Sequence, residues 1–277
     1  MSRFKLQVLV ADDASVVHEL FAALAKTSAI PFDLIRARDG RECMERLASG
    51  RINVAFIDVH MPEINGMDAV GEARRVGAKT FIALMSATSN TRRLQLARQL
   101  KVYEFLEKPF TPADVMAVLQ TYCRVTVPSQ ALIVDDSATV RAIIKRVLAN
   151  SIFNLDPTEA ADGETAFTFC EHGRFDVVFL DCNMPGMDGM ATLDRLLARD
   201  PNVKVIMISG EQNEERRRRA LARGARAFLQ KPFFPADIDR ELHAIFGLKM
   251  PMLAGIEPSP LAKAEFAEAM PLQWPAA

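Results

Sequence analysis

Acidic, hydroxyl and basic residues of the same types occur at two places in the chain with identical spacing. The first set is Asp12-Asp13, Asp58, Ser86 and Lys108-Pro109, and the second is Asp135-Asp136, Asp181, Ser209 and Lys231-Pro232. Each member of the second set lies 123 positions after its counterpart, and each member follows an apolar run. Two sets with the same internal spacing predict a duplicated domain that carries a duplicated polar site.

The side chains of one set have the chemistry of a phosphoryl-acceptor site. If the strands that end at Asp13 and Asp58 are neighbours, three carboxylates converge, and they repel one another unless a cation lies among them. Oxygen ligands favour a hard ion, and few ligands with room for water favour Mg²⁺. Lys108 adds a fixed positive charge and Ser86 a neutral donor. A tetrahedral anion bonded to Asp58 would meet all three, which favours phosphoryl transfer onto a carboxylate.

Alternating short apolar runs and amphipathic segments must position these residues. In the first half we expect strands at 7–10, 33–37, 54–57, 80–85 and 103–106, and helices near 16–27, 41–48, 68–76, 92–99 and 112–122. The pattern repeats from Ala131. Five strand–helix units in each half predict two α/β domains in tandem, each a flavodoxin-like, doubly wound, five-stranded parallel sheet. Ligand sites in such sheets lie at the carboxyl ends of the strands, where both sets fall.

Length and breaker residues suggest the domain limits. A chain of 277 residues has room for two ordinary domains. We predict a first domain at 1–125, a short linker at 126–130 containing Pro128, a second domain at 131–248, and a proline-rich tail at 249–277. The stretch after Gly247 is too short for a DNA-binding domain or a cyclase, so we expect no output domain.

Composition restricts the compartment and the partners. A formal net charge of −1 gives no bulk attraction to nucleic acid, so we expect no DNA binding. The apolar runs are much shorter than the ~20 residues of a membrane-spanning helix, and the first aspartates come too early for a signal peptide. Four widely spaced cysteines form no CxxC pair. These features favour a cytoplasmic protein without membrane insertion.

Five separated motifs in each half resemble those of response-regulator receiver domains, and the resemblance covers all of the chain except the tail. In the first half they include LVADD, FIDVHMPEINGMD, LMSAT and FLEKPF, and in the second LIVDD, FLDCNMPGMDG, MISG and FLQKPF. The second half is also similar to chemotaxis-type receivers. The resemblance implies two-component signalling, in which a histidine kinase or a phosphotransfer protein donates a phosphoryl group to an aspartate.

The resemblance also implies a role for each matched residue. The acceptors are Asp58 and Asp181, and the assisting residues are Lys108, Lys231, Ser86 and Ser209. Mg²⁺ is bound directly by Asp13 and Asp136, mostly through water by Asp12 and Asp135, and by Asp58, Asp181 and the backbone carbonyls of His60 and Asn183. Phe105 and Phe228 are the switch aromatics, which turn inward when the serine moves to the phosphoryl group. Both phenylalanines could instead be passive core residues. The Lys-Pro bonds resemble the cis peptides of the family.

The two halves differ beside the acceptor. His60 stands where the second half has Asn183, and Thr88 stands where it has Glu211. In the family these positions border the path of the water that hydrolyses the acyl phosphate. We therefore expect different phosphoryl lifetimes, with the shorter one on Asp181. The His60 side chain could be a metal ligand or a base, although a lone loop histidine is more often solvated.

Two charged or amphipathic segments have both a non-functional and a functional interpretation. The run Glu214–Arg223 holds four consecutive arginines, and a nearby predicted helix holds Asp237, Asp239 and Glu241. They are hydrated surface residues, or they pair two copies in a homodimer through the fourth helix, fifth strand and fifth helix. In the tail, Leu261–Met270 and Trp274 are part of a disordered segment or of a peptide that docks on a partner or on the receivers.

Three functions follow from these patterns. The favoured one is a tandem receiver that signals through phosphorylation-dependent contacts with a downstream protein, and is not an enzyme beyond slow self-dephosphorylation. The second is a phosphate sink or relay element that tunes a kinase. The third is an aspartyl-phosphate phosphohydrolase, which usually has a second acid two residues after the nucleophile. His60 and Asn183 occupy those positions and argue against it.

Overall fold

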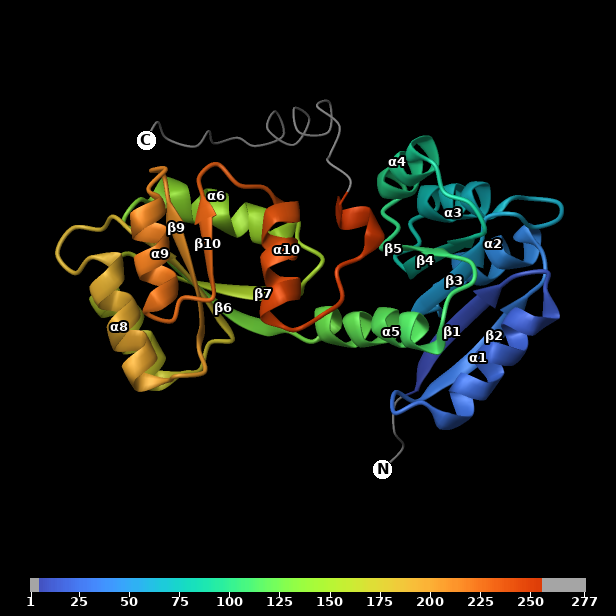
Figure 1. The fold of residues 1–277 in the computed structure, drawn as a ribbon, viewed down its shortest axis with the longest axis horizontal. Coiled ribbons are helices and arrows are strands. Elements are labelled where there is room, and N and C mark those ends of the chain that lie inside the picture. The colour runs from blue at the N-terminus through green and yellow to red at the C-terminus, as the bar shows by residue number, and fades with distance from the viewer. Residues whose placement is uncertain (1–4, 256–277) are drawn as a thin grey trace. The chain divides into compact units, whose positions relative to one another are not determined.

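The computed structural model describes residues 5–255, which divide into two compact units. The described residues of the first unit are 5–123 and 249–255, and those of the second are 124–248. Each unit holds one five-stranded sheet with helices packed on it (Figure 1). The predicted helix at 261–270 and Trp274 lie outside the described residues.

The first unit alternates strands and helices along the chain. Its elements are β1 (Leu6–Ala11), α1 (Ser15–Thr27), β2 (Phe32–Ala37), α2 (Gly40–Ala48), β3 (Val54–Asp58), α3 (Gly66–Arg75), β4 (Phe81–Ser86), α4 (Thr91–Gln99), β5 (Glu104–Glu107) and α5 (Pro112–Thr126). The strands pair in parallel in the order β2-β1-β3-β4-β5. The five predicted strands and five predicted helices of this half are confirmed.

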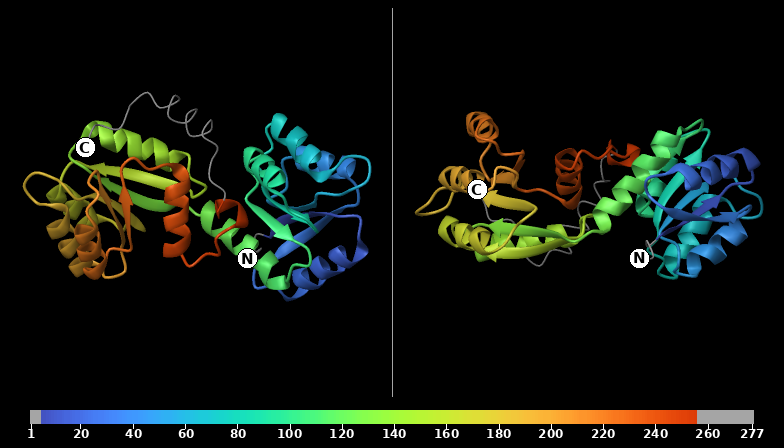
Figure 2. Two further views of the ribbon diagram at one scale, coloured as in Figure 1. Left: turned by 45° about the horizontal axis from the view of Figure 1, so that its top comes forward. Right: turned by 90° about the horizontal axis from the view of Figure 1, so that it is seen from below.

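The second unit repeats this architecture. Its elements are β6 (Ser129–Val134), α6 (Ala138–Ala149), β7 (Leu155–Ala160), α7 (Gly163–His172), β8 (Val177–Asp181), α8 (Gly189–Arg199), β9 (Lys204–Ser209), α9 (Glu214–Ala222), β10 (Ala227–Gln230) and α10 (Pro235–Ile245). The parallel order β7-β6-β8-β9-β10 is the order of the first sheet, and helices cover both faces of each sheet (Figure 2). The predicted tandem of flavodoxin-like α/β domains is confirmed.

Strand β1 shows how the first sheet is buried on both faces. Its alternate residues point to opposite sides. Val8 and Val10 join the buried cluster formed with α1 and α5, and Leu9 and Ala11 join the cluster formed with α2, α3 and α4. A continuous apolar strand is therefore the pattern of a parallel sheet between two helical layers.

Matched capping residues begin the corresponding helices of the two units. Asp39 and Asp162 cap α2 and α7, and Asn90 and Asn213 cap α4 and α9; each side chain accepts a backbone N–H of the first turn. Such a bond satisfies one of the N–H groups that a helix leaves free at its start. The caps therefore start corresponding helices at corresponding positions of the two units.

The structure differs from the predicted limits of the linker and the tail. Helix α5 continues to Thr126 and β6 begins at Ser129, so Val127 and Pro128 alone separate them within the expected linker 126–130. Proline disfavours helix for the residue before it, which ends α5 there. The first residues of the expected tail, 249–255, belong to the first unit and end in the short 3₁₀ helix η1 (Met252–Gly255). Burial of apolar side chains holds them there.

Candidate functional site

Three strand ends bring Asp12, Asp58 and Lys108 together in the first unit. Lys108 Nζ lies 2.7 Å from Asp12 Oδ2 and 2.6 Å from Asp58 Oδ1. Asp12 is 0% and Asp58 4% exposed, so both carboxylates are shielded from water. Because β1 lies beside β3, the two acids follow adjacent strands and face one ammonium group.

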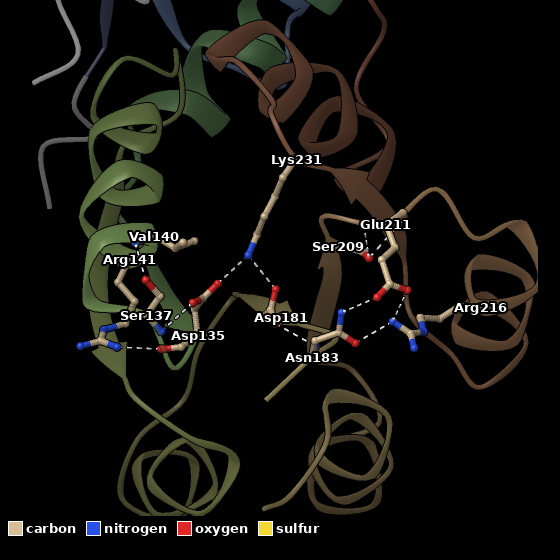
Figure 3. Close-up of polar contacts among 10 residues, drawn as sticks. All are labelled: Asp135, Ser137, Val140, Arg141, Asp181, Asn183, Ser209, Glu211, Arg216 and Lys231. Carbon is tan, nitrogen blue, oxygen red and sulfur yellow. Dashed lines mark hydrogen bonds and ion pairs between the residues drawn. The ribbon is translucent and has the colours of Figure 1, made fainter. Parts of the chain in front are cut away.

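The second unit contains the same arrangement. Lys231 Nζ lies 2.8 Å from Asp135 Oδ2 and 2.7 Å from Asp181 Oδ1 (Figure 3). Asp135 and Asp181 are buried as well. The distance from the lysine to the first acid is 2.7 Å in one unit and 2.8 Å in the other, and the distance to the acceptor is 2.6 and 2.7 Å. The two sites therefore agree within about a tenth of an ångström.

Backbone groups orient the acceptor carboxylates. Asp58 Oδ2 accepts the N–H of His60 at 2.9 Å, and Asp181 Oδ2 accepts the N–H of Asn183 at 2.8 Å. A Cβ at Gly66 would lie 2.0 Å from the Asp58 carbonyl oxygen, and a Cβ at Gly189 would lie 2.2 Å from that of Asp181. Only glycine permits this approach of the following helix to the acceptor.

The lysines, serines and prolines are also placed alike. The backbone N–H of Lys108 donates to the Ser86 carbonyl at 2.8 Å, and that of Lys231 to the Ser209 carbonyl at 2.8 Å. The Lys108-Pro109 and Lys231-Pro232 peptide bonds are cis, which confirms the prediction for both.

Burial and ion pairing set the charges of the site. Burial raises the pKa of Asp58 and of Asp135, because a carboxylate loses its hydration, while the lysine opposes the shift. Burial by itself lowers the pKa of Lys108 and Lys231, but hydrogen bonds to two carboxylates outweigh it, so the pKa of both lysines is raised. Each lysine therefore stays charged at neutral pH and offers a positive group to an incoming anion.

The expected grouping of three acids is not formed in either unit. Asp13 and Asp136 are exposed, and no three His, Cys, Asp or Glu side chains within residues 5–255 are close enough to hold a metal ion together. The two buried carboxylates of each site nevertheless lie side by side, each with one oxygen atom on the same lysine ammonium. That donor set fits Mg²⁺, which is usually bound through one or two carboxylates while it keeps several waters.

The hydroxyls and aromatics expected to switch lie next to the site. Ser86 Oγ donates to the Thr88 carbonyl at 2.9 Å, and Ser209 Oγ to the Glu211 carbonyl at 3.3 Å, so both are engaged within their own loops. Phe105 is 2% exposed, whereas Phe228 is only partly buried.

An arginine on the fourth helix of each unit bridges two loops. Arg216 belongs to the basic run Glu214–Arg223, whereas the sequence analysis did not single out Arg93. Arg216 Nη1 donates to Asn183 Oδ1 at 2.6 Å and lies 3.3 Å from Glu211 Oε2 (Figure 3). In the first unit Arg93 contacts His60 Nε2 at 3.1 Å and Thr88 Oγ1 at 3.0 Å.

These arginines tie the loop after the acceptor to the loop after the serine. Arg93 and Arg216 are also 123 positions apart, so the displacement that relates the acids could have identified them.

The carbonyl of the first acid is held by different residues in the two units. His18 Nε2 lies 2.7 Å from the Asp12 carbonyl oxygen, and Arg141 Nη1 donates to that of Asp135 at 2.7 Å. These two residues, also missed, again occupy corresponding positions. The histidine and the arginine perform the same positioning task with different side chains.

Most of the arginines in the basic run have partners close by. Arg217 pairs with Glu214, Arg219 with Glu215 and Arg223 with Asp194. On α10, Asp237 pairs with Arg240, and Asp239 accepts hydrogen bonds from Ser151 and the Ile152 N–H. Most of the charges proposed to pair two copies are thus engaged within the unit.

Comparison with known proteins identifies the family. The family model for the response regulator receiver domain matches residues 8–120 and 131–243. The chain therefore belongs to the response-regulator receiver family and contains two receiver domains.

Relatives and solved structures agree with this assignment. The chemotaxis protein CheY-3 of Vibrio cholerae is 38% identical over 117 residues, 42% of this chain and 89% of that protein. The chemotaxis protein CheY of Listeria monocytogenes is 38% identical over 114 residues, 41% of this chain and 92% of that protein. A probable two-component system response regulator/GGDEF domain protein matches with a TM-score of 0.61 at 21% identity, over 87% of this chain and all of that one, and supports the fold.

Proposed function

We propose that Asp58 and Asp181 each accept a phosphoryl group from a histidine kinase or a phosphotransfer protein. The observation that carries this proposal is the charged lysine, 2.6 Å from the acceptor oxygen in the first unit and 2.7 Å in the second. An acceptor oxygen attacks the phosphorus of a phosphohistidine, the N–P bond breaks, and the imidazole leaves as the neutral ring after it takes a proton. The lysine offsets the negative charge that this step brings to the site.

Mg²⁺ belongs to the same proposal as the cofactor of both sites. Asp12, Asp13, Asp58 and the His60 carbonyl would hold it in the first unit. In the second unit the corresponding ligands are Asp135, Asp136, Asp181 and the Asn183 carbonyl. The ion supplies positive charge that neutralises the phosphoryl oxygens.

The switch is proposed to begin at the serine. Ser86 or Ser209 leaves the carbonyl of its loop and bonds the phosphoryl oxygen, and Phe105 or Phe228 then repacks. Phe228 is only partly buried, so an inward turn would bury it further. This repacking changes the surface formed by the fourth helix, fifth strand and fifth helix of each domain.

The output is proposed to be a contact with a downstream protein, in chemotaxis-type signalling. Support comes from the chemotaxis relatives, which match single receivers of this chain. A phosphate sink or phosphorelay element that tunes a kinase is the alternative. A phosphohydrolase is disfavoured, because His60 and Asn183 stand where a second acid is usual. Beyond phospho-acceptance we propose slow self-dephosphorylation and no other enzymatic activity.

A cytoplasmic location without DNA binding completes the proposal. All four cysteines are free, as expected in a reducing compartment. No helix among residues 5–255 is long and apolar enough to cross a membrane. Pairing of two copies through α9, β10 and α10 stays a prediction, which light scattering of the phosphorylated and unphosphorylated protein tests.

The central experiment uses acetyl phosphate with Mg²⁺ on the full chain and on Asp58→Asn, Asp181→Asn and the double mutant. Intact mass should show two added phosphoryl groups on the parent, one on each single mutant and none on the double mutant. A pull-down with each form then separates the two roles. A partner captured by the phosphorylated form alone supports output, and loss of phosphoryl groups from a kinase without such a partner supports a sink. Modification of the double mutant contradicts the assignment of the acceptors.

A further inference from the structure

The segment that follows α10 packs against β5 of the first receiver. Residues 249–255 belong to the first unit, although the residues that precede them belong to the second. Leu253 is 4% exposed and joins the buried cluster that includes Ala97, Val102 and Phe105. Its neighbour Met252 is 40% exposed. The segment therefore buries Pro251 and Leu253 and leaves Met252, which lies between them, in solvent.

A buried carboxylate on β5 receives the backbone of this segment. Glu104 is 5% exposed, and its Oε1 accepts the Met252 N–H at 2.8 Å and the Phe105 N–H at 2.8 Å. A buried carboxylate is unfavourable unless hydrogen bonds replace its water. Met252 supplies one of those bonds from 148 positions along the chain. The receiver thus carries a polar group whose partner comes from outside the receiver sequence.

An ion pair sets the direction of the segment. Lys249 Nζ lies 2.6 Å from Asp114 Oδ1 on α5. The hydrogen bond from Lys249, together with those from Thr111, lowers the pKa of Asp114 to about 2. Since Lys249 is half exposed, the pair contributes more to orientation than to stability.

The second receiver provides an internal comparison. Ala227 occupies on β10 the position that Glu104 has on β5, and an alanine side chain cannot accept an N–H. Phe228, the counterpart of Phe105, is only partly buried. Glu104 and the buried position of Leu253 are therefore features of the first receiver, whereas Asp114, the partner of Lys249, has a counterpart, Asp237, in the second.

We propose that this face of the first receiver is a peptide-binding site, that residues Lys249–Gly255 are its occupant, and that phosphorylation of Asp58 releases them. The release rests on the function proposed above. Strand β5 connects the two sites, because Glu104 and Phe105 begin it and Lys108, the partner of Asp58, follows its last residue. A conformational change at Phe105 or Lys108 alters the buried cluster in which Leu253 packs. Release uncovers Glu104 and its apolar surroundings for a partner peptide of the same chemistry, a basic residue followed by an apolar one.

Hydrogen exchange on the full-length protein tests the docking. Amides of 249–255 and of β5 should exchange slowly in the unphosphorylated chain. Leu253→Ala should raise exchange of the segment by about tenfold or more, because it removes the buried side chain. Met252→Ala is the matched control and should leave exchange unchanged, since it alters an exposed side chain and keeps the N–H. Fast exchange of 249–255 in the parent chain overturns the proposal.

Phosphorylation in the Asp181→Asn background tests the release. With acetyl phosphate and Mg²⁺, exchange of 249–255 should increase by about tenfold or more, and the Asp58→Asn,Asp181→Asn protein should not respond. Intact mass on the same samples reports whether Asp58 is modified. Unchanged slow exchange in modified protein overturns the release. Failure of Asp58 to take up phosphate overturns the proposed function and the release with it, whereas docking is still decided by Leu253→Ala against Met252→Ala.

Discussion

Arg216 Nη1 lies 2.6 Å from Asn183 Oδ1, and this bond links the loop after the acceptor of the second receiver to the start of α9. The corresponding contact of the first receiver joins Arg93 to the ring of His60. Arginine only donates, so Nε2 of His60 is the acceptor in this contact. The same bridge therefore holds an amide in one receiver and an imidazole ring in the other, beside otherwise matching acceptors.

We expect Arg216→Ala to lengthen the life of the phosphoryl group on Asp181 by about threefold to tenfold. The substitution frees Asn183 and Glu211, and loss of a fixed orientation slows the attack of water. Decay of the phosphorylated Asp58→Asn protein measures the rate. Arg218→Ala removes the same charge from an exposed position of α9 and serves as the control. Equal decay rates for the two arginine variants contradict the role given to Arg216.

The two receivers should lose their phosphoryl groups at different rates, with the shorter lifetime on Asp181. Asn183 and Glu211 differ from His60 and Thr88 in hydrogen-bonding capacity at the mouth of the site. The Asp58→Asn and Asp181→Asn proteins, each phosphorylated with acetyl phosphate and then freed of donor, give the two rates separately. Equal dephosphorylation rates of Asp58 and Asp181 contradict the expected difference between the two receivers.

Gly66→Ala should destabilise the first receiver by about 2–3 kcal/mol and reduce phosphorylation of Asp58. The new Cβ would lie 2.0 Å from the Asp58 carbonyl oxygen, so the backbone must shift. Gly71→Ala, in the same helix, meets a flexible Leu100 side chain at 3.7 Å and should be neutral or stabilise by up to about 1 kcal/mol. Urea unfolding and phosphorylation of the Asp181→Asn background compare the two variants. A Gly66 variant as stable as the Gly71 variant refutes the steric argument.

Asp239→Asn should stabilise the second receiver at neutral pH by about 2 kcal/mol. Burial raises the pKa of Asp239 from its ordinary value of 3.8 to about 6, so the native state binds more protons than the unfolded state between these values. Stability contributed by this group is thus present in full below the unfolded pKa and is lost as the pH rises through 6. The gain from asparagine should vanish near pH 4. Urea unfolding at several pH values, with hydrogen exchange in α10 as the readout, measures this gain in stability.

An exposed aspartate of β7 provides the control for that pH dependence. Asp156→Asn removes a carboxylate from a solvated position and should not give a gain that grows between pH 4 and 7. If both variants show the same profile, the effect comes from net charge and not from burial of Asp239.

Much of the fold and the core of each site could be predicted from the sequence. Continuous apolar strands, capping residues and proline positions are local signals, and the displacement of 123 residues between Asp58 and Asp181 shows that one pattern occurs twice. Since strand ends meet at one edge of a parallel sheet, the convergence of Asp12, Asp58 and Lys108 follows from strand order alone.

Tertiary structure decided the contacts that join distant segments. The bond between Glu104 and Met252 spans 148 positions, and no periodicity relates the two residues. The bridge made by Arg93 requires that two loops meet, and the pair between Arg223 and Asp194 requires that α9 and α8 lie side by side. Sequence patterns report how each element buries its own apolar face. Which polar groups meet when the elements pack is determined only once the elements are placed in the fold.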